Sequence, residues 1–269
     1  MKEAERVPVL MYHRVAEPKN SWEARYGVAP KNFKEQVHAL VHAGYRAVGI
    51  DSLIAWLDGG TPLPDGSIVV TFDDGFRSVR EFAQPVLSEV GWPFTVFLVS
   101  DLIGGQDVWT RDENPAGVSY PLLGADEIVG MLKDGVSFHS HTRSHPSLPT
   151  LGDEALADQL KGSQAALRQL LGCDVSYLAY PYGHADARVQ AAARSAGYRA
   201  AFSTRSGFNR RDVDRFQIRR IDVFGTDTPA MLLRKMRLGT NDGSVAHMTR
   251  YYVDRVVNRL GLGFREVPR

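Results

Sequence analysis

The run from Ser67 to Phe72 constrains the fold most, because its residues are nearly all apolar and several are β-branched. It begins after Pro64-Asp65-Gly66 and ends at Asp73-Asp74-Gly75. A short run of this kind is typical of a strand that is buried on both faces of a parallel sheet. Adjacent strand residues point to opposite faces, so Asp73 and Asp74 can share one cavity only if the strand ends or bends there, which Gly75 permits.

Strand-like and helix-like segments alternate along most of the chain, which is the pattern of repeated β-strand and α-helix units. The expected strands cover residues 7–12, 46–50, 67–72, 94–99, 136–138, 177–180, 200–204 and 215–223. The expected helices cover residues 32–41, 53–57, 77–90, 125–133, 154–171 and 186–196, and Asn32 is the expected N-cap of the first. The sequence therefore predicts an α/β fold built on a parallel sheet.

The size of the chain suits a single domain. It has 269 residues, 43% of them hydrophobic, and about 250 residues is typical of one β/α barrel. The 32 Lys and Arg against 31 Asp and Glu leave a net charge of +1, so no strong field favours nucleic acid or an acidic polymer. The single Cys173 excludes an internal disulfide and a thiolate metal cluster.

A second polar run follows another predicted strand. Val136-Ser137-Phe138 leads into the segment from His139 to His145, which Pro146 closes. Because α/β folds place their reactive groups at the carboxyl ends of the strands, we expect the two polar runs to meet. Hydrolytic zinc sites commonly use three protein ligands of the His or Asp type and leave a fourth position for water. One Asp and two His satisfy this count, and the remaining Asp is then available as a base.

At these residues the chain resembles the polysaccharide deacetylases of carbohydrate esterase family 4, whose shared region is the NodB homology domain. The resemblance rests on Thr71-Phe72-Asp73-Asp74-Gly75, on the His-Ser/Thr-x-x-His pattern from His141 to His145, and on Tyr180-Pro181-Tyr182-Gly183. It covers roughly residues 7–223. It implies a distorted (β/α)7-type barrel in residues 1–240, and residues 241–269 are expected to form an amphipathic helix and tail packed on that barrel.

The resemblance also implies roles for individual residues. By this likeness Asp74, His141 and His145 bind the metal, and Asp73 is the catalytic base. His139, two residues before His141, would otherwise compete with it, since both would lie on one face of a strand. The metal would be Zn²⁺ or another divalent ion such as Co²⁺, Ni²⁺ or Fe²⁺.

The opening Val9-Leu10-Met11-Tyr12-His13-Arg14-Val15 resembles the branch that deacetylates biofilm poly-N-acetylglucosamine. In that branch the general-acid histidine stands near the start of the chain, which assigns the role to His13, with His247 as the next candidate. The backbone N–H of Tyr182, placed by Pro181, would bind the oxyanion, and Trp109 is a candidate for stacking on a sugar ring. The expected reaction removes the N-acetyl group from an N-acetylglucosamine-type sugar of an acetylated glycan and releases acetate.

One departure from the family pattern is Ala179, since many relatives carry an arginine there that orients the catalytic acid. Arg219 or Arg220 is expected to supply that charge to Asp73 instead. Asp222, on the same predicted strand, is expected to reach the ring nitrogen of His13 that faces away from substrate and to fix its tautomer. A strand-end ion pair between Asp222 and an arginine is the alternative.

Other functions stay open at this point. The same residues would serve an O-acetyl esterase or a deacetylase of a small sugar conjugate, and the Ala179 departure leaves room for a non-catalytic glycan-binding barrel. The apolar and basic residues from Val245 to Leu260 predict an amphipathic helix that packs on the barrel, or that contacts a membrane surface or a partner. The charged N-terminus lacks an apolar secretory segment, which predicts a cytoplasmic protein, or a periplasmic or cell-surface one if a leader was removed.

Overall fold

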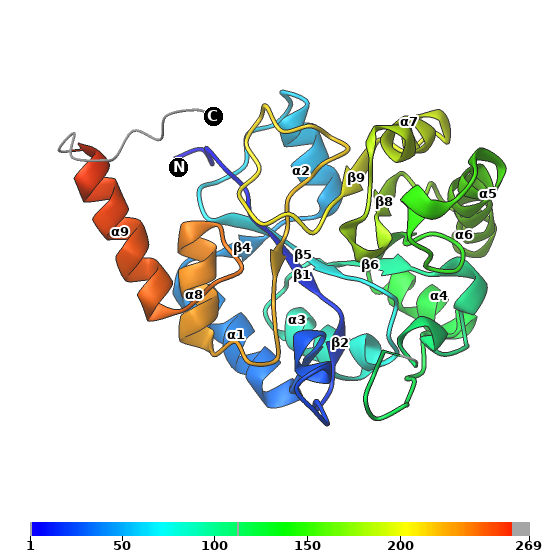
Figure 1. The fold of residues 1–269 in the computed structure, drawn as a ribbon, viewed down its shortest axis with the longest axis horizontal. Helices are drawn as coiled ribbons and strands as arrows, with labels where there is room; N and C mark the ends of the chain where they lie inside the picture. The colour runs from blue at the N-terminus through cyan, green and yellow to red at the C-terminus, as the bar shows by residue number, and fades with distance from the viewer. Residues whose placement is uncertain (1, 112, 260–269) are drawn as a thin grey trace.

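A parallel sheet forms the centre of the computed structural model, which describes residues 2–111 and 113–259 (Figure 1). Within these residues the sheet has eight strands in the order β10-β1-β5-β6-β7-β8-β9, with β4 paired to β5. The strands are β1 Val9–Tyr12, β4 Arg46–Ala47, β5 Ser67–Phe72, β6 Thr95–Leu98, β7 Ser137–Ser140, β8 Tyr177–Ala179, β9 Ala200–Phe202 and β10 Ile221–Asp222. A separate two-stranded sheet pairs β2 Arg14–Val15 with β3 Gly27–Val28. The expected α/β fold of the distorted barrel type is confirmed.

The segment before β10 brings the two ends of the sheet together. β10 pairs with β1, and Phe202 of β9 forms a parallel bridge with Ile218. The backbone N–H of Ser203 also donates to the Ile218 carbonyl at 2.8 Å. The sheet therefore curls until its two edge strands, β9 and β10, are linked through residues 215–222. As a result, the carboxyl ends of β1, β5, β7 and β8 face one region.

Helices pack around the curled sheet, except α9, which lies beyond α8 (Figure 1). They are α1 Pro30–His42, α2 Ile50–Leu57, α3 Gln84–Glu89, α4 Ala125–Lys133, α5 Asp153–Ala157, α6 Ser163–Leu171, α7 Ala187–Ser195, α8 Pro229–Leu238 and α9 Val245–Arg259. Strand residues of one parity, such as Val70 and Phe138, join the larger hydrophobic cluster with most of the helices. Residues of the other parity, such as Val69 and Phe97, pack in a second cluster with α2. Both faces of the strands are buried, as their apolar composition predicts.

Several helices differ from the expected ones. α1 begins at Pro30, because proline suits the first helical position, so the prediction that Asn32 caps it is wrong. The Asn32 side chain donates instead to the carbonyl of Asp227 at 3.0 Å. The two long expected helices are each interrupted by a π-helical turn, Val79–Ala83 before α3 and Asp158–Gly162 between α5 and α6.

The C-terminal helix α9 forms at the expected place beside α8 (Figure 1). Three of its apolar residues, Val245, Tyr252 and Val253, are nevertheless 58%, 40% and 52% exposed, so the expected packing on the barrel is absent at these side chains. Val256, Val257 and Leu260 lie outside the described side chains. Contact of α9 with a membrane surface or a partner stays a prediction. No helix within the described residues is long and apolar enough to span a bilayer.

Candidate active site

A cavity of about 330 Å³ opens where the carboxyl ends of the strands converge. Its polar lining includes the expected residues His13, Asp73, Asp74, His141, His145 and Asp222. Its aromatic lining consists of Trp22, Tyr26, Phe76, Trp109, Tyr120, Tyr180, Tyr182 and Phe224. A concave site that combines apolar rings with a few converging polar groups is suited to a small ligand or one unit of a polymer.

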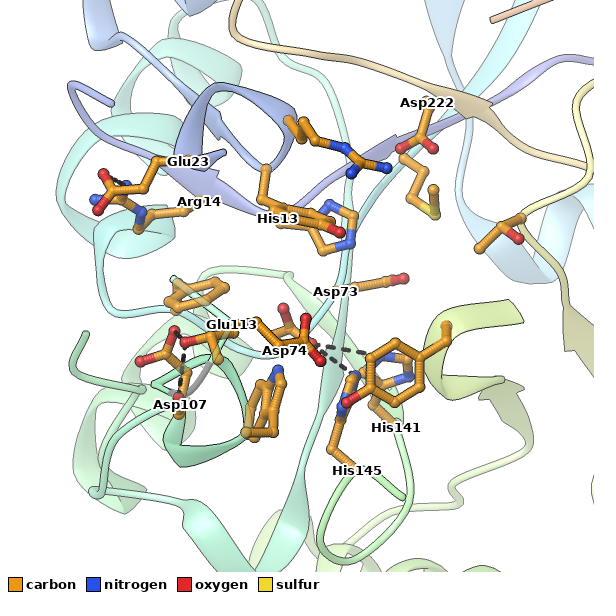
Figure 2. Close-up of a pocket in the computed structure, with 18 of the residues that line it drawn as sticks. His13, Arg14, Glu23, Asp73, Asp74, Asp107, Glu113, His141, His145 and Asp222 are labelled. Atoms are coloured by element: carbon orange, nitrogen blue, oxygen red, sulfur yellow. Dashed lines mark hydrogen bonds and ion pairs between the residues drawn. The ribbon is translucent and has the colours of Figure 1, made fainter. Parts of the chain in front are cut away.

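Asp74, His141 and His145 meet on one side of this cavity (Figure 2). Oδ1 of Asp74 lies 3.4 Å from Nε2 of His141 and 3.4 Å from Nε2 of His145. One ligand atom from each residue falls within a group no wider than 4.8 Å, and all three side chains are buried. The segments that carry them follow β5 and β7, which the sequence predicted as the sources of the ligands.

The chemistry of this group fits a divalent cation. Asp74 Oδ1 is buried and has no hydrogen-bond partner among the described residues, although a buried carboxylate oxygen is costly to leave unpaired. Nδ1 of His141 lies 2.8 Å from the carbonyl of Ala179, an arrangement that turns its Nε2 lone pair towards the group. Burial lowers the pKa of His145 to about 3, so this ring is neutral at neutral pH, as a metal ligand must be.

The backbone around this group adopts an uncommon conformation. Asp74, Thr142, His145 and Tyr182 have φ values of 72°, 70°, 64° and 58°, and they are the non-glycine residues with positive φ in the described chain. Such conformations cost of order 1–3 kcal/mol each and concentrate at functional sites, where the surrounding fold must hold them. At Asp74 this bend, with Gly75 next to it, lets both aspartates reach one cavity, as the sequence required.

Asp73 is held by Arg220. Nη1 and Nη2 of Arg220 donate to the two carboxylate oxygens of Asp73 at 2.6 and 2.8 Å, and both side chains are buried. Burial alone would raise the pKa of Asp73, but the charge and hydrogen bonds of Arg220 lower it to about 2. Of the two arginines expected to replace the missing one at position 179, Arg220 therefore contacts Asp73, whereas Arg219 is exposed.

We call Asp74, His141 and His145 the metal-ligand group. His13 and Asp222 lie on the other side of the cavity from it (Figure 2). The hydrogen bond expected between them is not seen: Nδ1 of His13 is buried without a partner among the described residues. Burial raises the pKa of Asp222, and the charges of His13 and Arg220 act against this rise. Asp222 and His13 therefore line the same cavity, while the role of Asp222 in orienting that ring stays a prediction.

Aromatic rings surround the metal-ligand group. The Trp109 ring stacks on His145 with centroids 4.4 Å apart and planes 21° apart, and Tyr182 meets His145 edge-on at 4.7 Å. Trp109 and Tyr182 both line the cavity, as expected of substrate-binding residues. Pro181 is buried and is not among the lining residues, so it acts on the cavity only through the turn that presents Tyr182.

Two of the other histidines, His139 and His247, are not among the residues that line the cavity. His139 is buried against Tyr177 and Phe97, outside the metal-ligand group, and burial lowers its pKa to about 4. His184 lines the cavity, whereas His247 lies on α9, 3.6 Å from Asp242. The His139 side chain therefore packs between residues of the neighbouring strands β6 and β8.

Three buried charged residues beside the cavity were not predicted: Arg14, Glu23 and Asp107. Arg14 follows His13 directly, but a single charge next to a strand carries no pattern that marks it as buried. Asp107 lies in the irregular segment of residues 103–111 and 113–124, which forms one wall of the cavity, and burial raises its pKa to about 6. It accepts hydrogen bonds from the Thr110 hydroxyl at 2.7 Å and from the Tyr120 backbone N–H, so it stabilises this wall.

Comparisons with known proteins agree with this geometry. A curated poly-beta-1,6-N-acetyl-D-glucosamine N-deacetylase of Staphylococcus epidermidis is 25% identical over 234 residues, which cover 80% of this chain and 78% of the relative. The solved structure of IcaB from Ammonifex degensii superimposes with a TM-score of 0.70 at 27% identity, covering 82% of this chain and 93% of that one.

The deacetylase PplD of Streptococcus pyogenes, solved with acetate, shares the fold with a TM-score of 0.73 at 21% identity, covering 86% of this chain and 98% of that one. A sequence model described as polysaccharide deacetylase matches residues 60–201, which contain Asp73, Asp74, His141, His145 and the Tyr-Pro-Tyr-Gly turn. Since this match spans more than half of the 269 residues, the chain belongs to the polysaccharide deacetylase family.

Proposed function

We propose that the protein is a metal-dependent deacetylase that hydrolyses the N-acetyl group of N-acetylglucosamine-type sugars in a polysaccharide or oligosaccharide and releases acetate. The observation that carries this proposal is that Asp73, held by Arg220, lines the same cavity as the group formed by Asp74, His141 and His145. Family membership and the poly-N-acetylglucosamine deacetylase among the relatives support the substrate class.

We propose Zn²⁺ as the ion, because one carboxylate and two imidazoles are the ligands of many hydrolytic zinc sites. Asp74, His141 and His145 would hold it. A bound divalent ion of this kind polarises the acetyl carbonyl and makes water more acidic. Elemental analysis of the purified protein tests the identity of the ion, since Co²⁺, Ni²⁺ and Fe²⁺ suit the same ligands.

Asp73 would accept the proton of the attacking water. Its low pKa keeps the carboxylate ionised, and the two hydrogen bonds from Arg220 hold it in place at the cavity. The backbone N–H of Tyr182 would donate to the oxyanion that forms. His13, across the cavity, would give a proton to the departing amine, so that the C–N bond breaks to yield acetate and a free amino sugar. The rings of Trp109 and Tyr182 would contact the sugar.

Acetate release from zinc-loaded protein incubated with N-acetylglucosamine oligomers tests this function. Asp73→Asn should lower the rate by about 10²–10⁴ while the zinc content stays equal. Acetylated xylan and a small N-acetylated sugar conjugate serve as competing substrates. Faster acetate release from xylan would make the protein an O-acetyl esterase, and oligomer binding without acetate release would make it a glycan-binding barrel.

A further inference from the structure

We call His13, Asp73, Asp74, His141 and His145 the catalytic group. A buried ion pair lies beside these residues and includes none of them. Nη2 of Arg14 donates to Oε2 of Glu23 at 2.7 Å, and the two residues are only 6% and 2% exposed (Figure 2). Arg14 is the residue after His13, and Glu23 belongs to the loop of residues 16–26, which we call the entry loop. Neither side chain takes part in the hydrolysis described above, so the burial of this charged pair next to the cavity has a different cause.

Glu23 receives hydrogen bonds from two loops that are distant in sequence. On its own side, the backbone N–H of Lys19 donates to Oε2 at 2.8 Å. From residues 103–111 and 113–124, which we call the wall loop, Asn114 Nδ2 and the Tyr120 hydroxyl donate to Oε1 at 3.0 and 2.6 Å. With Arg14, four donors meet on one carboxylate. Burial would raise the pKa of Glu23, but these donors lower it to about 2.

Two more contacts join the same loops. The side chain of Asn20 in the entry loop donates to Oδ1 of Asn114 at 3.1 Å. The guanidinium carbon of Arg14 lies 3.7 Å from the centroid of the Tyr120 ring, a distance at which a cation is attracted to the ring face. The entry and wall loops are therefore connected by charge, hydrogen bonds and stacking around Glu23.

Each loop carries rings that face a different part of the catalytic group. In the entry loop, Tyr26 meets His13 edge-on at 5.4 Å and packs against Trp22 at 5.2 Å. In the wall loop, Trp109 stacks on His145. One carboxylate thus connects the loop beside His13 with the loop over His145, and all three aromatic rings line the cavity.

We propose that Glu23 is a positioning residue that holds the entry and wall loops at a fixed separation, and thereby shapes the cleft for a glycan chain rather than for the acetyl group alone. This inference rests on the proposed function. If the loops separate, a glycan loses contact with rings on both sides of the cavity, whereas a small acetyl ester needs only the catalytic group. Loss of the Glu23 carboxylate should therefore raise KM for oligomers more than it changes kcat for the ester.

The test compares Glu23→Gln, Tyr120→Phe and wild type, all loaded with zinc. Glu23→Gln leaves Arg14 without its counter-ion and lowers stability, so Tyr120→Phe provides the milder variant: it keeps the ring over Arg14 and removes one donor to Glu23. Glu89→Gln is the control, because it removes a carboxylate from exposed contacts with Lys34 and His38, and Glu89 does not line the cavity. Kinetics are measured with N-acetylglucosamine oligomers and with p-nitrophenyl acetate, and amide hydrogen exchange is measured for both loops.

We expect KM for oligomers to rise about tenfold in Glu23→Gln and severalfold in Tyr120→Phe, the effect of losing a hydrogen bond to a charged group, with kcat for the ester within about twofold. Exchange should speed up in both loops together in each variant and stay unchanged in Glu89→Gln. Faster exchange in only one loop, or an unchanged oligomer KM in Glu23→Gln, overturns the proposal. If wild type releases no acetate from any glycan, the proposed function fails, and exchange then decides alone whether Glu23 couples the loops.

Discussion

Arg220 and Asp73 form a bidentate pair across 147 residues of chain, with both carboxylate oxygens accepting from the guanidinium. Nε of Arg220 also donates to the Ser203 carbonyl at 2.9 Å, which fixes the arginine on the strand segment that closes the barrel. Many relatives are expected to orient this aspartate from position 179, where this chain has alanine. The same charge is thus supplied by the segment just before β10, and Asp73 stays ionised.

Arg220→Ala should lower both activity and stability. Removing one partner of a buried pair leaves an uncompensated charge, at a cost of about 3–5 kcal/mol. A misplaced base should cost about 10²-fold in kcat. Arg220→Lys keeps the charge but loses the bidentate geometry and should fall between Arg220→Ala and wild type. Urea unfolding and the rate of acetate release measure the two effects.

Arg219→Ala is the matched control for that experiment. Arg219 is the adjacent arginine, is exposed, and makes a side-chain contact of 3.5 Å with the Ser206 carbonyl. Its loss should change stability by about 0.5 kcal/mol or less. Equal losses of activity in Arg219→Ala and Arg220→Ala would contradict the orienting role of Arg220.

Metal binding should depend on Asp74 and His145 but not on His139. Asp74→Asn removes the charge at the centre of the ligand group, so we expect loss of bound zinc and of acetate release. Zinc at about 100 times its Kd should stabilise the wild type by about 2.7 kcal/mol, and a chelator should reverse this. Thermal unfolding with and without zinc measures the effect without any assay of activity.

His139→Leu is the control for the ligand assignment, since His139 lies two residues before His141 but packs against Tyr177 and Phe97. This variant should still bind one zinc ion and gain stability from it. If zinc instead stabilised Asp74→Asn and failed to stabilise His139→Leu, the ligand set would have to be redrawn around β7.

The parts of the fold that follow from local pattern could be predicted from the sequence. β5 was expected at the residues where it is found, because its apolar run is bounded by turn residues and by the two aspartates. Helix α8 was missed, although Thr228 caps it, Pro229 occupies its first position and most of its residues are apolar, so this helix too carried a local signal. The split of the long helices by π-helical turns has no local signal in the chain.

The convergence of Asp73, Asp74, His141 and His145 on one cavity was predictable for a different reason than their surroundings. Aspartates and histidines at strand ends are brought together by the parallel topology itself. The network of Glu23 was not, because its donors Asn114 and Tyr120 are 91 and 97 residues away, and their pairing depends on how two irregular loops fold. The buried Lys235 of α8, which pairs with Asp227 and donates to the Asp222 carbonyl of β10 at 3.1 Å, likewise depends on how that helix packs against the sheet.

His13→Ala should impair amide hydrolysis far more than ester hydrolysis. An amine must gain a proton before it leaves, whereas a phenolate leaves without one, so loss of the general acid should cost about 10²–10⁴ for N-acetylglucosamine oligomers and little for p-nitrophenyl acetate. His247→Ala, on α9 away from the cavity, should behave as wild type with both substrates. Equal losses on amide and ester would assign His13 to structure and leave the acid unidentified.

Glu23 should make the folded state sensitive to acid. Its pKa is about 2 in the folded protein against an ordinary value of 4.5, so the unfolded chain takes up this proton first as the pH falls. The stabilisation is therefore present above pH 4.5 and is lost as the pH falls through 2.

The free energy of unfolding of wild type minus that of Glu23→Gln should be largest near neutral pH and shrink steadily towards pH 2 to 3. Measuring both proteins with a chelator removes the contribution of metal release, and carboxylates common to both cancel in the difference. Glu89→Gln, which removes only exposed contacts with Lys34 and His38, should differ from wild type by less than about 1 kcal/mol throughout. A wild-type advantage over Glu23→Gln that stayed constant across this range would mean that the four donors do not hold an ionised carboxylate at Glu23.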